Sequence, residues 1–158
     1  MPTITRKVNP RNQVGATPWG NSHKLQYPLR TAANGGAIDA DSSAPIAIGD
    51  KVRLGRIPAG SLLADSLMVI STAFTAGVTA NIGFEYIDGV DSTAAPQDDD
   101  YFAAAAVLSS AALLRKTTPT MPVTLPKDAW LIATFAGANN AKVARLDMVL
   151  SLASEGVA

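Results

Sequence analysis

The 158-residue sequence contains no cysteine and only one histidine, His23. The absence of cysteine excludes disulfides, thiolate metal sites and cysteine nucleophiles. A histidine-based metal cluster or a Ser-His-Asp triad would depend on His23 alone. The sequence also lacks a Walker A motif, a glycine-rich dinucleotide fingerprint and a GxSxG nucleophile elbow. We therefore expect no enzyme activity, no cofactor and no metal site.

Charged residues are also scarce, at 16% of the sequence against 47% hydrophobic residues. Soluble domains usually carry about 25% charged residues. A surface with so little charge is typical of a protein whose surface is covered by partners. The apolar runs stay short of the roughly 18 residues that a transmembrane helix needs. The N-terminus lacks the apolar core of a secretory signal, so we expect no membrane association.

The few charges are unevenly placed along the chain. The first 38 residues hold five of the thirteen basic residues and no acidic one, and the other eight basic residues share the remainder with all thirteen acidic residues. The result is a basic N-terminal segment on a body with a net charge of −5. Five charges spread this thinly, with few aromatic residues, are a weak signature of nucleic-acid binding. The pattern favours contact with an acidic protein surface.

The pattern of apolar residues is that of short strands. Asp50–Arg56 alternates in polarity, Leu67–Ser71 is apolar on both faces and so predicts a fully buried strand, and Ile82, Phe84 and Tyr86 share one face of a third strand. Turns containing Pro58 and Gly60, and then Gly77, separate the three. Further strands are predicted at Ser22–Thr31, where Pro28 indicates a sheet edge, at Ala129–Phe135 and at Val143–Leu152.

Two segments break this regularity. Thr117–Pro126 contains three prolines and predicts an edge strand or an extended crossover. The alanine-rich stretch after Asp98–Asp100 predicts a short helix near Asp99–Ala106, with the acidic residues capping its N-terminus. The predicted fold is all-β, a β-sandwich or jelly-roll-like barrel over residues 22–158, with one short helix and an extended N-terminal arm over residues 1–21.

The acidic residues between the third strand and this helix allow a second interpretation. Asp88, Asp91 and Asp98–Asp100 could supply oxygen ligands to Ca²⁺, but their spacing does not fit an EF-hand loop. A helix cap and a solvated loop are the favoured interpretation. A hydrolase using two carboxylates would need two of these acids to converge, whereas most lie in Gly/Pro/Asp-rich loops where exposure to solvent is the default.

The arm is the predicted binding element. It is spaced by prolines and glycines, has no helical or strand period, and is expected to be extended and ordered only when a partner holds it. Trp19 could anchor it, while Trp130 fits a core or interface position; either tryptophan could instead stack on a sugar. The residues predicted to bind the partner are Arg6, Lys7, Arg11, Trp19, His23 and Lys24.

The run Arg53–Phe84, RLGRIPAGSLLADSLMVISTAFTAGVTANIGF, resembles the small head proteins of tailed bacteriophages. In these proteins a G-x-(I/L)-P-A-G turn leads into an apolar strand that ends in an (S/T)-x-A-F-(x)-x-G-x-T turn. The resemblance extends over Lys51–Ala106 and includes the segment DDDYFAAAA. The matching residues of the two turns are Gly55, Ile57, Pro58, Ala59, Gly60, Thr72, Ala73, Phe74, Gly77 and Thr79.

This resemblance implies a capsid decoration, or cement, protein with a β-sandwich or jelly-roll-like fold. Such a protein binds the major capsid protein on the outside of an icosahedral head, often as a trimer, with a dimer as the alternative. Its location would be the capsid surface of the virion, and the host cytoplasm during assembly. Two other functions fit the sequence: another virion component, in the neck, tail or spike, or a carbohydrate-binding β-sandwich module.

Overall fold

The computed structural model describes residues 2–7 and 22–154, and all the regular structure in these ranges is β-strand. The predicted all-β class is therefore confirmed for this part of the chain, which contains no helix able to cross a membrane. The strands are β1 (Thr3–Thr5), β2 (Ser22–Arg30), β3 (Lys51–Ile57), β4 (Ser61–Thr72), β5 (Thr79–Tyr86), β6 (Asp98–Val107), β7 (Ala112–Arg115), β8 (Ala129–Ala136) and β9 (Arg145–Ser154).

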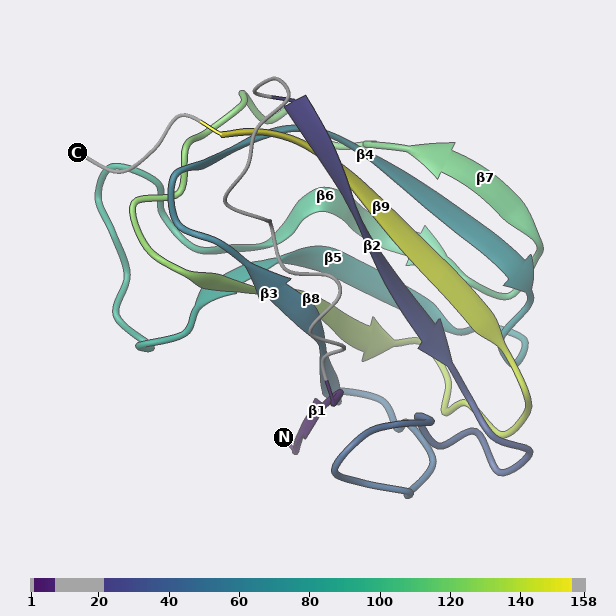
Figure 1. Ribbon diagram of the computed structural model, residues 1–158. Helices are drawn as coiled ribbons and strands as arrows, with labels where there is room; N and C mark the ends of the chain where they lie inside the picture. Colours follow the sequence, from purple (N-terminus) through teal and green to yellow (C-terminus); the bar gives the residue numbers. More distant parts are fainter. Residues whose placement is uncertain (1, 8–21, 155–158) are drawn as a thin grey trace.

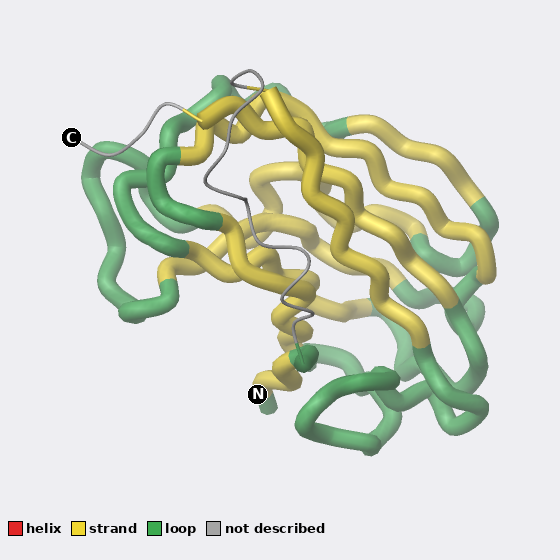
Figure 2. The backbone as a smooth tube through the Cα atoms, viewed as in Figure 1, coloured by secondary structure: helices red, strands yellow, loops and turns green. Residues whose placement is uncertain are grey.

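The strands form two sheets that face each other (Figure 1). One sheet has the order β1-β3-β8-β5-β6 and the other the order β2-β9-β4-β7. Apart from β1, this division is the strand order of an eight-stranded jelly roll. Figure 2 shows the loops gathered at the two ends of the strands. The sheets stay separate, so the structure is a sandwich and not a closed barrel.

The inward faces of both sheets make one hydrophobic core. Along β9, alternate residues from Leu146 to Leu152 are at most 1% exposed, as the period-two pattern predicts. On the opposite sheet, Ile82, Phe84 and Tyr86 of β5 are buried in the same core. The alternation predicted for these two strands is confirmed, and it is what joins the sheets.

The three strands expected between Asp50 and Phe84 are present, but they do not pair with one another. Strands β3 and β5 lie in the five-stranded sheet with β8 between them, and β4 lies in the other sheet. The turns that join them therefore carry the chain across the sandwich and back. Gly60 and Gly77 have φ angles of 74° and 83° in these turns, a region that glycine enters without steric cost.

The prediction that Leu67–Ser71 is buried on both faces is wrong. Met68 points into the core and is 2% exposed, whereas Leu67 and Val69 are only partly buried on the outer face of β4. A continuous apolar run is typical of strands covered on both sides. Here no second layer of the described chain covers the outer side of this sheet, so the outward residues stay accessible.

The predicted helix at Asp99–Ala106 is also wrong, because this stretch belongs to strand β6. The helix preference of alanine over most other residues is worth less than about 0.7 kcal/mol per position. Burial of Tyr101 and Phe102 in the core outweighs it. The strand keeps an irregular pairing with β5, and the exposed Ala105 adopts a φ of 46°, as at a bulge.

Two predictions about extended segments are confirmed. The segment Ser22–Thr31 contains β2, which ends the four-stranded sheet, so Pro28 lies on an edge strand as expected. The proline-rich segment Thr117–Pro126 forms an extended crossover between β7 and β8. It contains an isolated bridge between Thr124 and Leu62 and no strand.

The start of the N-terminal arm is docked on the domain itself. Thr3–Thr5 runs parallel to β3, Ile4 is 3% exposed, and the backbone N–H of Lys7 donates to the carbonyl of Asp39 over 2.7 Å. The prediction that the arm needs a partner for order is therefore wrong for Thr3–Thr5. Residues 8–21 of the arm lie outside the described residues.

One tyrosine connects the two sheets at a glycine of β3. Tyr27 of β2 donates a 2.7 Å hydrogen bond from its hydroxyl to the carbonyl of Arg56. Its ring lies against Gly55, where a Cβ atom would come within 2.4 Å of the ring. Gly55 is thus required for the close approach of Tyr27 and not for an unusual backbone angle.

On the outer face of the five-stranded sheet, Glu85 of β5 ties β5 to β3 across β8. Its carboxylate accepts hydrogen bonds from Lys51 Nζ at 2.6 Å and from Arg53 Nε at 2.9 Å. Burial raises the pKa of Glu85, but the two cations outweigh it, so the pKa lies below its usual value of 4.5. The ionised carboxylate is therefore the stabilised form.

We predict that Gly55→Ala lowers the free energy of unfolding by about 1–3 kcal/mol, because the added methyl overpacks the Tyr27 ring. Urea denaturation measures this. In a Tyr27→Leu background the same change should cost clearly less, since the ring that the methyl meets is gone. An equal cost in both backgrounds would show that Gly55 does not act through Tyr27.

We predict that Glu85→Gln costs about 1 kcal/mol at pH 7, after allowance for the partial exposure of the cluster. A lowered carboxyl pKa stabilises the fold at pH values above 4.5, and this contribution is lost as the pH falls through the folded-state pKa. The stability gap between wild type and variant should therefore close in acid. Urea denaturation at pH 7 and pH 3 tests this, and a gap independent of pH contradicts the assignment.

Candidate partner-binding surfaces

The basic residues at the start of the arm are only partly available to a partner. The N–H of Arg6 donates to the carbonyl of Arg53 at 3.2 Å, and its side chain is half-buried. This burial lowers the pKa of Arg6, against the opposing effect of Asp39. Lys7 is exposed. Of these two predicted binding residues, Arg6 faces its own domain and Lys7 faces solvent.

The other predicted binding residues lie elsewhere. His23 and Lys24 begin β2, at the end of the sandwich opposite β1 (Figure 1). His23 is half-buried and its Nε2 has no hydrogen-bond partner among the described residues, whereas Lys24 is exposed. Arg11 and Trp19 lie outside the described residues. The four described members of the predicted set are therefore not gathered into one site, and the role of the set stays a prediction.

The outer face of the five-stranded sheet is occupied by its own side chains. Trp130 is half-buried beside Glu85, and the guanidinium of Arg53 lies over its ring at 5.6 Å from the ring centroid. Trp130 therefore lies on the outer face of the sheet and not in the core, and an interface role for it stays a prediction. A sugar stacking on this face of the ring would have to displace Arg53, so the geometry does not favour a carbohydrate site here.

The outer face of the four-stranded sheet is different, because a row of apolar side chains crosses it. Val149 of β9 pairs with Leu67 of β4, and Val69 lies next along β4; all three are partly exposed. Ion pairs flank this row, and they are Arg115–Asp65 and Arg145–Asp147. This face has the composition of a surface that another protein could cover.

The structure divides the acidic residues that were considered for Ca²⁺. Carboxylate oxygens of Asp98, Asp99 and Asp100 lie within 4.8 Å of one another. Asp88 instead pairs with Lys127 at 2.8 Å, and Asp91 accepts the N–H of Gln97 at 2.7 Å. The favoured interpretation was half correct: the loop acids are solvated and hydrogen-bonded, but Asp98–Asp100 caps no helix because β6 follows it.

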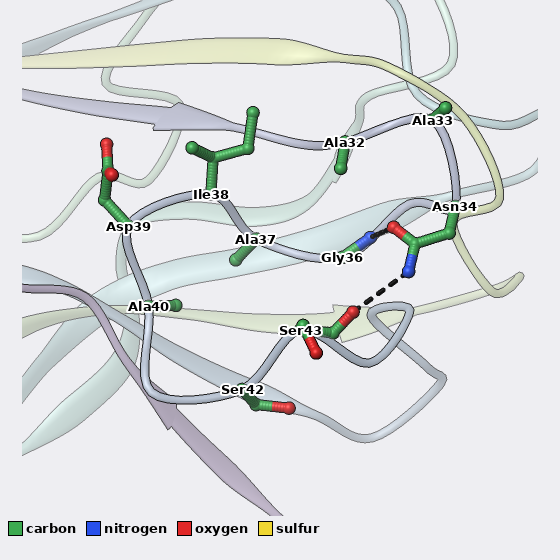
Figure 3. Close-up of a pocket in the computed structure, with 10 residues that line it drawn as sticks. All are labelled: Ala32, Ala33, Asn34, Gly36, Ala37, Ile38, Asp39, Ala40, Ser42 and Ser43. Carbon is green, nitrogen blue, oxygen red and sulfur yellow. Dashed lines mark hydrogen bonds between the residues drawn. The ribbon is translucent and has the colours of Figure 1, made fainter.

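A pocket of about 550 Å³ lies within the loop Ala32–Ser43, and Figure 3 shows the residues that line it. Small side chains and backbone line it. The side chain of Asn34 donates to the carbonyl of Ser43 and accepts from the N–H of Gly36, each over 3.0 Å. The amide thus holds the loop in shape. The lining contains one carboxylate, Asp39, which pairs with Arg30 at 3.3 Å, and two serines, but no histidine.

One exposed apolar feature was missed at the sequence level. Val107 ends β6 with 52% of its surface exposed, and Leu113 of β7 is 67% exposed. The exposure of these two residues was not predicted, because the alanines before Val107 were expected to form a helix with one buried side. The signal that could have found it is the uncharged run Ala103–Leu114.

No family model and no curated protein matches this sequence. The fold, however, matches chains in solved capsid structures. One is a chain in "Capsid of Ralstonia phage GP4", with a TM-score of 0.65 and 13% identity over 99% of this chain and 100% of that chain. Another is in "Cyanophage Pam1 capsid asymmetric unit", with a TM-score of 0.58 and 12% identity over 92% of this chain and 96% of that chain.

Both matches include almost the entire length of each chain, so they concern the complete sandwich and not a shared fragment. At 12–13% identity, the likeness shows a shared backbone fold and assigns no role to any individual residue. The resemblance to phage head proteins, inferred from the turns around Gly55 and Gly77, is confirmed at this level. The chain has the fold of a phage-capsid component.

Proposed function

We propose that this protein is a structural component of a phage virion that binds the outer surface of the capsid and stabilises the shell. The observation that carries the proposal is the end-to-end match with a chain of the Ralstonia phage GP4 capsid, over 99% of this chain and all of that one. The partner is the major capsid protein, and the site of action is the virion surface after assembly in the host cytoplasm. No enzymatic step is involved.

The stabilisation is a matter of linkage. A protein that binds the assembled shell, and not its separated subunits, favours the assembled state by about 2.7 kcal/mol per site when its free concentration is 100 times the Kd. A copy that contacts two neighbouring subunits adds a link between them. A rigid sandwich with little surface charge, at 16% charged residues in the sequence, suits this role.

The arm contributes to attachment in this proposal. The chain pairs with the domain at β1 and again at β2, and sixteen residues, numbered 6–21, separate these two strands in the sequence. Arg11 and Trp19 belong to that connection. They offer a charge and a large aromatic anchor, the residue types that dominate protein interfaces. The trimer, with a dimer as the alternative, remains part of the same proposal.

Co-sedimentation of the purified protein with undecorated heads tests the function. We expect saturable binding and a higher temperature of head disruption, because bound protein stabilises the assembled shell. A protein that belongs to the neck, tail or spike should saturate at far fewer copies, since those structures occupy one vertex. Failure to bind undecorated heads contradicts the proposal.

We predict that the double substitution Arg11→Ala/Trp19→Ala weakens head binding by about tenfold or more, because interface arginines and tryptophans commonly contribute above 1 kcal/mol each. Binding titrations by sedimentation measure this. Lys142→Ala, which removes an exposed charge of the loop before β9, is the matched control and should change little. Unchanged binding by the double variant would remove the arm from the interface.

A further inference from the structure

Two edge strands of the sandwich lie together on one side of the molecule. β6 ends the five-stranded sheet, β7 ends the four-stranded sheet, and residues 108–111 join them directly (Figures 1 and 2). We call the segment Ala103–Leu114 the β6–β7 edge. It combines the free side of two strands with the loop between them.

This edge lacks the protection that edge strands normally carry. Natural sheets block their edges with charged residues, prolines or covering segments, because unpaired backbone groups recruit other strands. The β2 edge of this protein follows the rule, with Lys24, Pro28 and Arg30 along it. The β6–β7 edge has no charged residue and no proline in twelve positions, and it exposes Val107 by 52% and Leu113 by 67%.

The chain covers only one part of β6. The N–H of Thr117 donates to the carbonyl of Phe102 at 3.0 Å, and the hydroxyl of Thr120 donates to the carbonyl of Tyr101, also at 3.0 Å. Beyond this cover, Ala103–Val107 pairs with β5 alone among the described residues. The remaining half of the strand is therefore open to another chain.

An acidic group lies directly beside the open half. The side chain of Asn81 donates to a carboxylate oxygen of Asp99 at 3.2 Å and accepts the N–H of Ala105 at 2.8 Å, so one amide holds both features. None of Asp98–Asp100 forms an ion pair within residues 2–7 and 22–154. The hydrogen bond with Asp98, together with the neighbouring charges, raises the pKa of Asp100. A cation from a partner would relieve this repulsion.

We propose that the β6–β7 edge receives an extended segment of the capsid subunit. That segment pairs with Ala103–Val107 by backbone hydrogen bonds, places a small or apolar side chain on Val107, and sets a Lys or Arg opposite Asp98–Asp100. Strand addition to a free edge is a common mode of peptide recognition. The charge pattern of the edge selects this occupant: uncharged along the strand and basic at the end that meets the acids. The inference rests on the function proposed above.

The test is binding of edge variants to undecorated heads. Val107→Lys places a charge where the partner strand would lie, and the position is 52% exposed, so the domain should fold normally. The matched control is Val90→Lys, at an equally accessible valine, 61% exposed, in the loop after β5. Val107 pairs with Thr79 at the start of β5, so the two valines are at opposite ends of that strand. We expect at least about a tenfold loss for the edge variant and less than about twofold for the control.

Two further readouts make the result decisive. Hydrogen exchange of the wild type should show amides of Ala103–Val107 becoming protected when heads are added, apart from Ala105, whose N–H already donates to Asn81. Asp99→Asn should weaken binding and reduce its dependence on salt, because one charge contact is lost.

Equal binding by wild type and edge variant, or unprotected edge amides in the bound state, overturns the inference while leaving the function intact. A change in the oligomeric state of the free edge variant would also overturn it, by assigning the edge to a second copy. Failure of the wild type to bind heads would instead refute the function itself.

Discussion

The structure depends on the burial of one apolar face of each sheet against the other. The sequence has no cysteine and therefore no disulfide between the sheets. In the described residues, the hydrophobic core is the main contact that joins the two sheets. Successive strands β3, β4 and β5 alternate between the sheets, so each turn between them carries the chain from one sheet to the other. Gly60 and Gly77 make these crossings short, and Gly55 lets Tyr27 reach from one layer to the backbone of the other. These glycines, which are part of the resemblance, thus allow the two sheets to be joined closely.

Local sequence was sufficient wherever one face of a strand is buried and the other is polar. The alternation of β9 and the proline on β2 identified a core strand and an edge strand correctly. Local sequence was insufficient where pairing with a distant strand determines the secondary structure. The alanines of β6 favour a helix in isolation, yet pairing with β5 makes them a strand. Three residues of β1 carry no periodic signal, although Ile4 is buried. The same limit applies to the candidate sites. The sequence indicated the acidic residues Asp98–Asp100, but the exposed apolar residues Val107 and Leu113 were not predicted, because the alanines before them were expected to form a helix.

The surfaces of the sandwich differ in how far they are satisfied internally. On the five-stranded sheet, Glu85 meets two cations and Arg53 covers Trp130, which leaves few groups that need a partner. By contrast, the apolar row on the four-stranded sheet is partly exposed, and the uncharged β6–β7 edge leaves Val107 and Leu113 more than half exposed. In the proposed function, the phage shell would cover these surfaces.

We propose that this domain sits on the outside of a phage shell and repeats with the shell lattice. A cryo-electron microscopy reconstruction of the virion carrying the protein tests this most directly. The account predicts density for the jelly-roll sandwich at equivalent positions over the whole icosahedral lattice, outside the major capsid protein. Density confined to the neck, the tail or one vertex, or a shell without the sandwich, would contradict it.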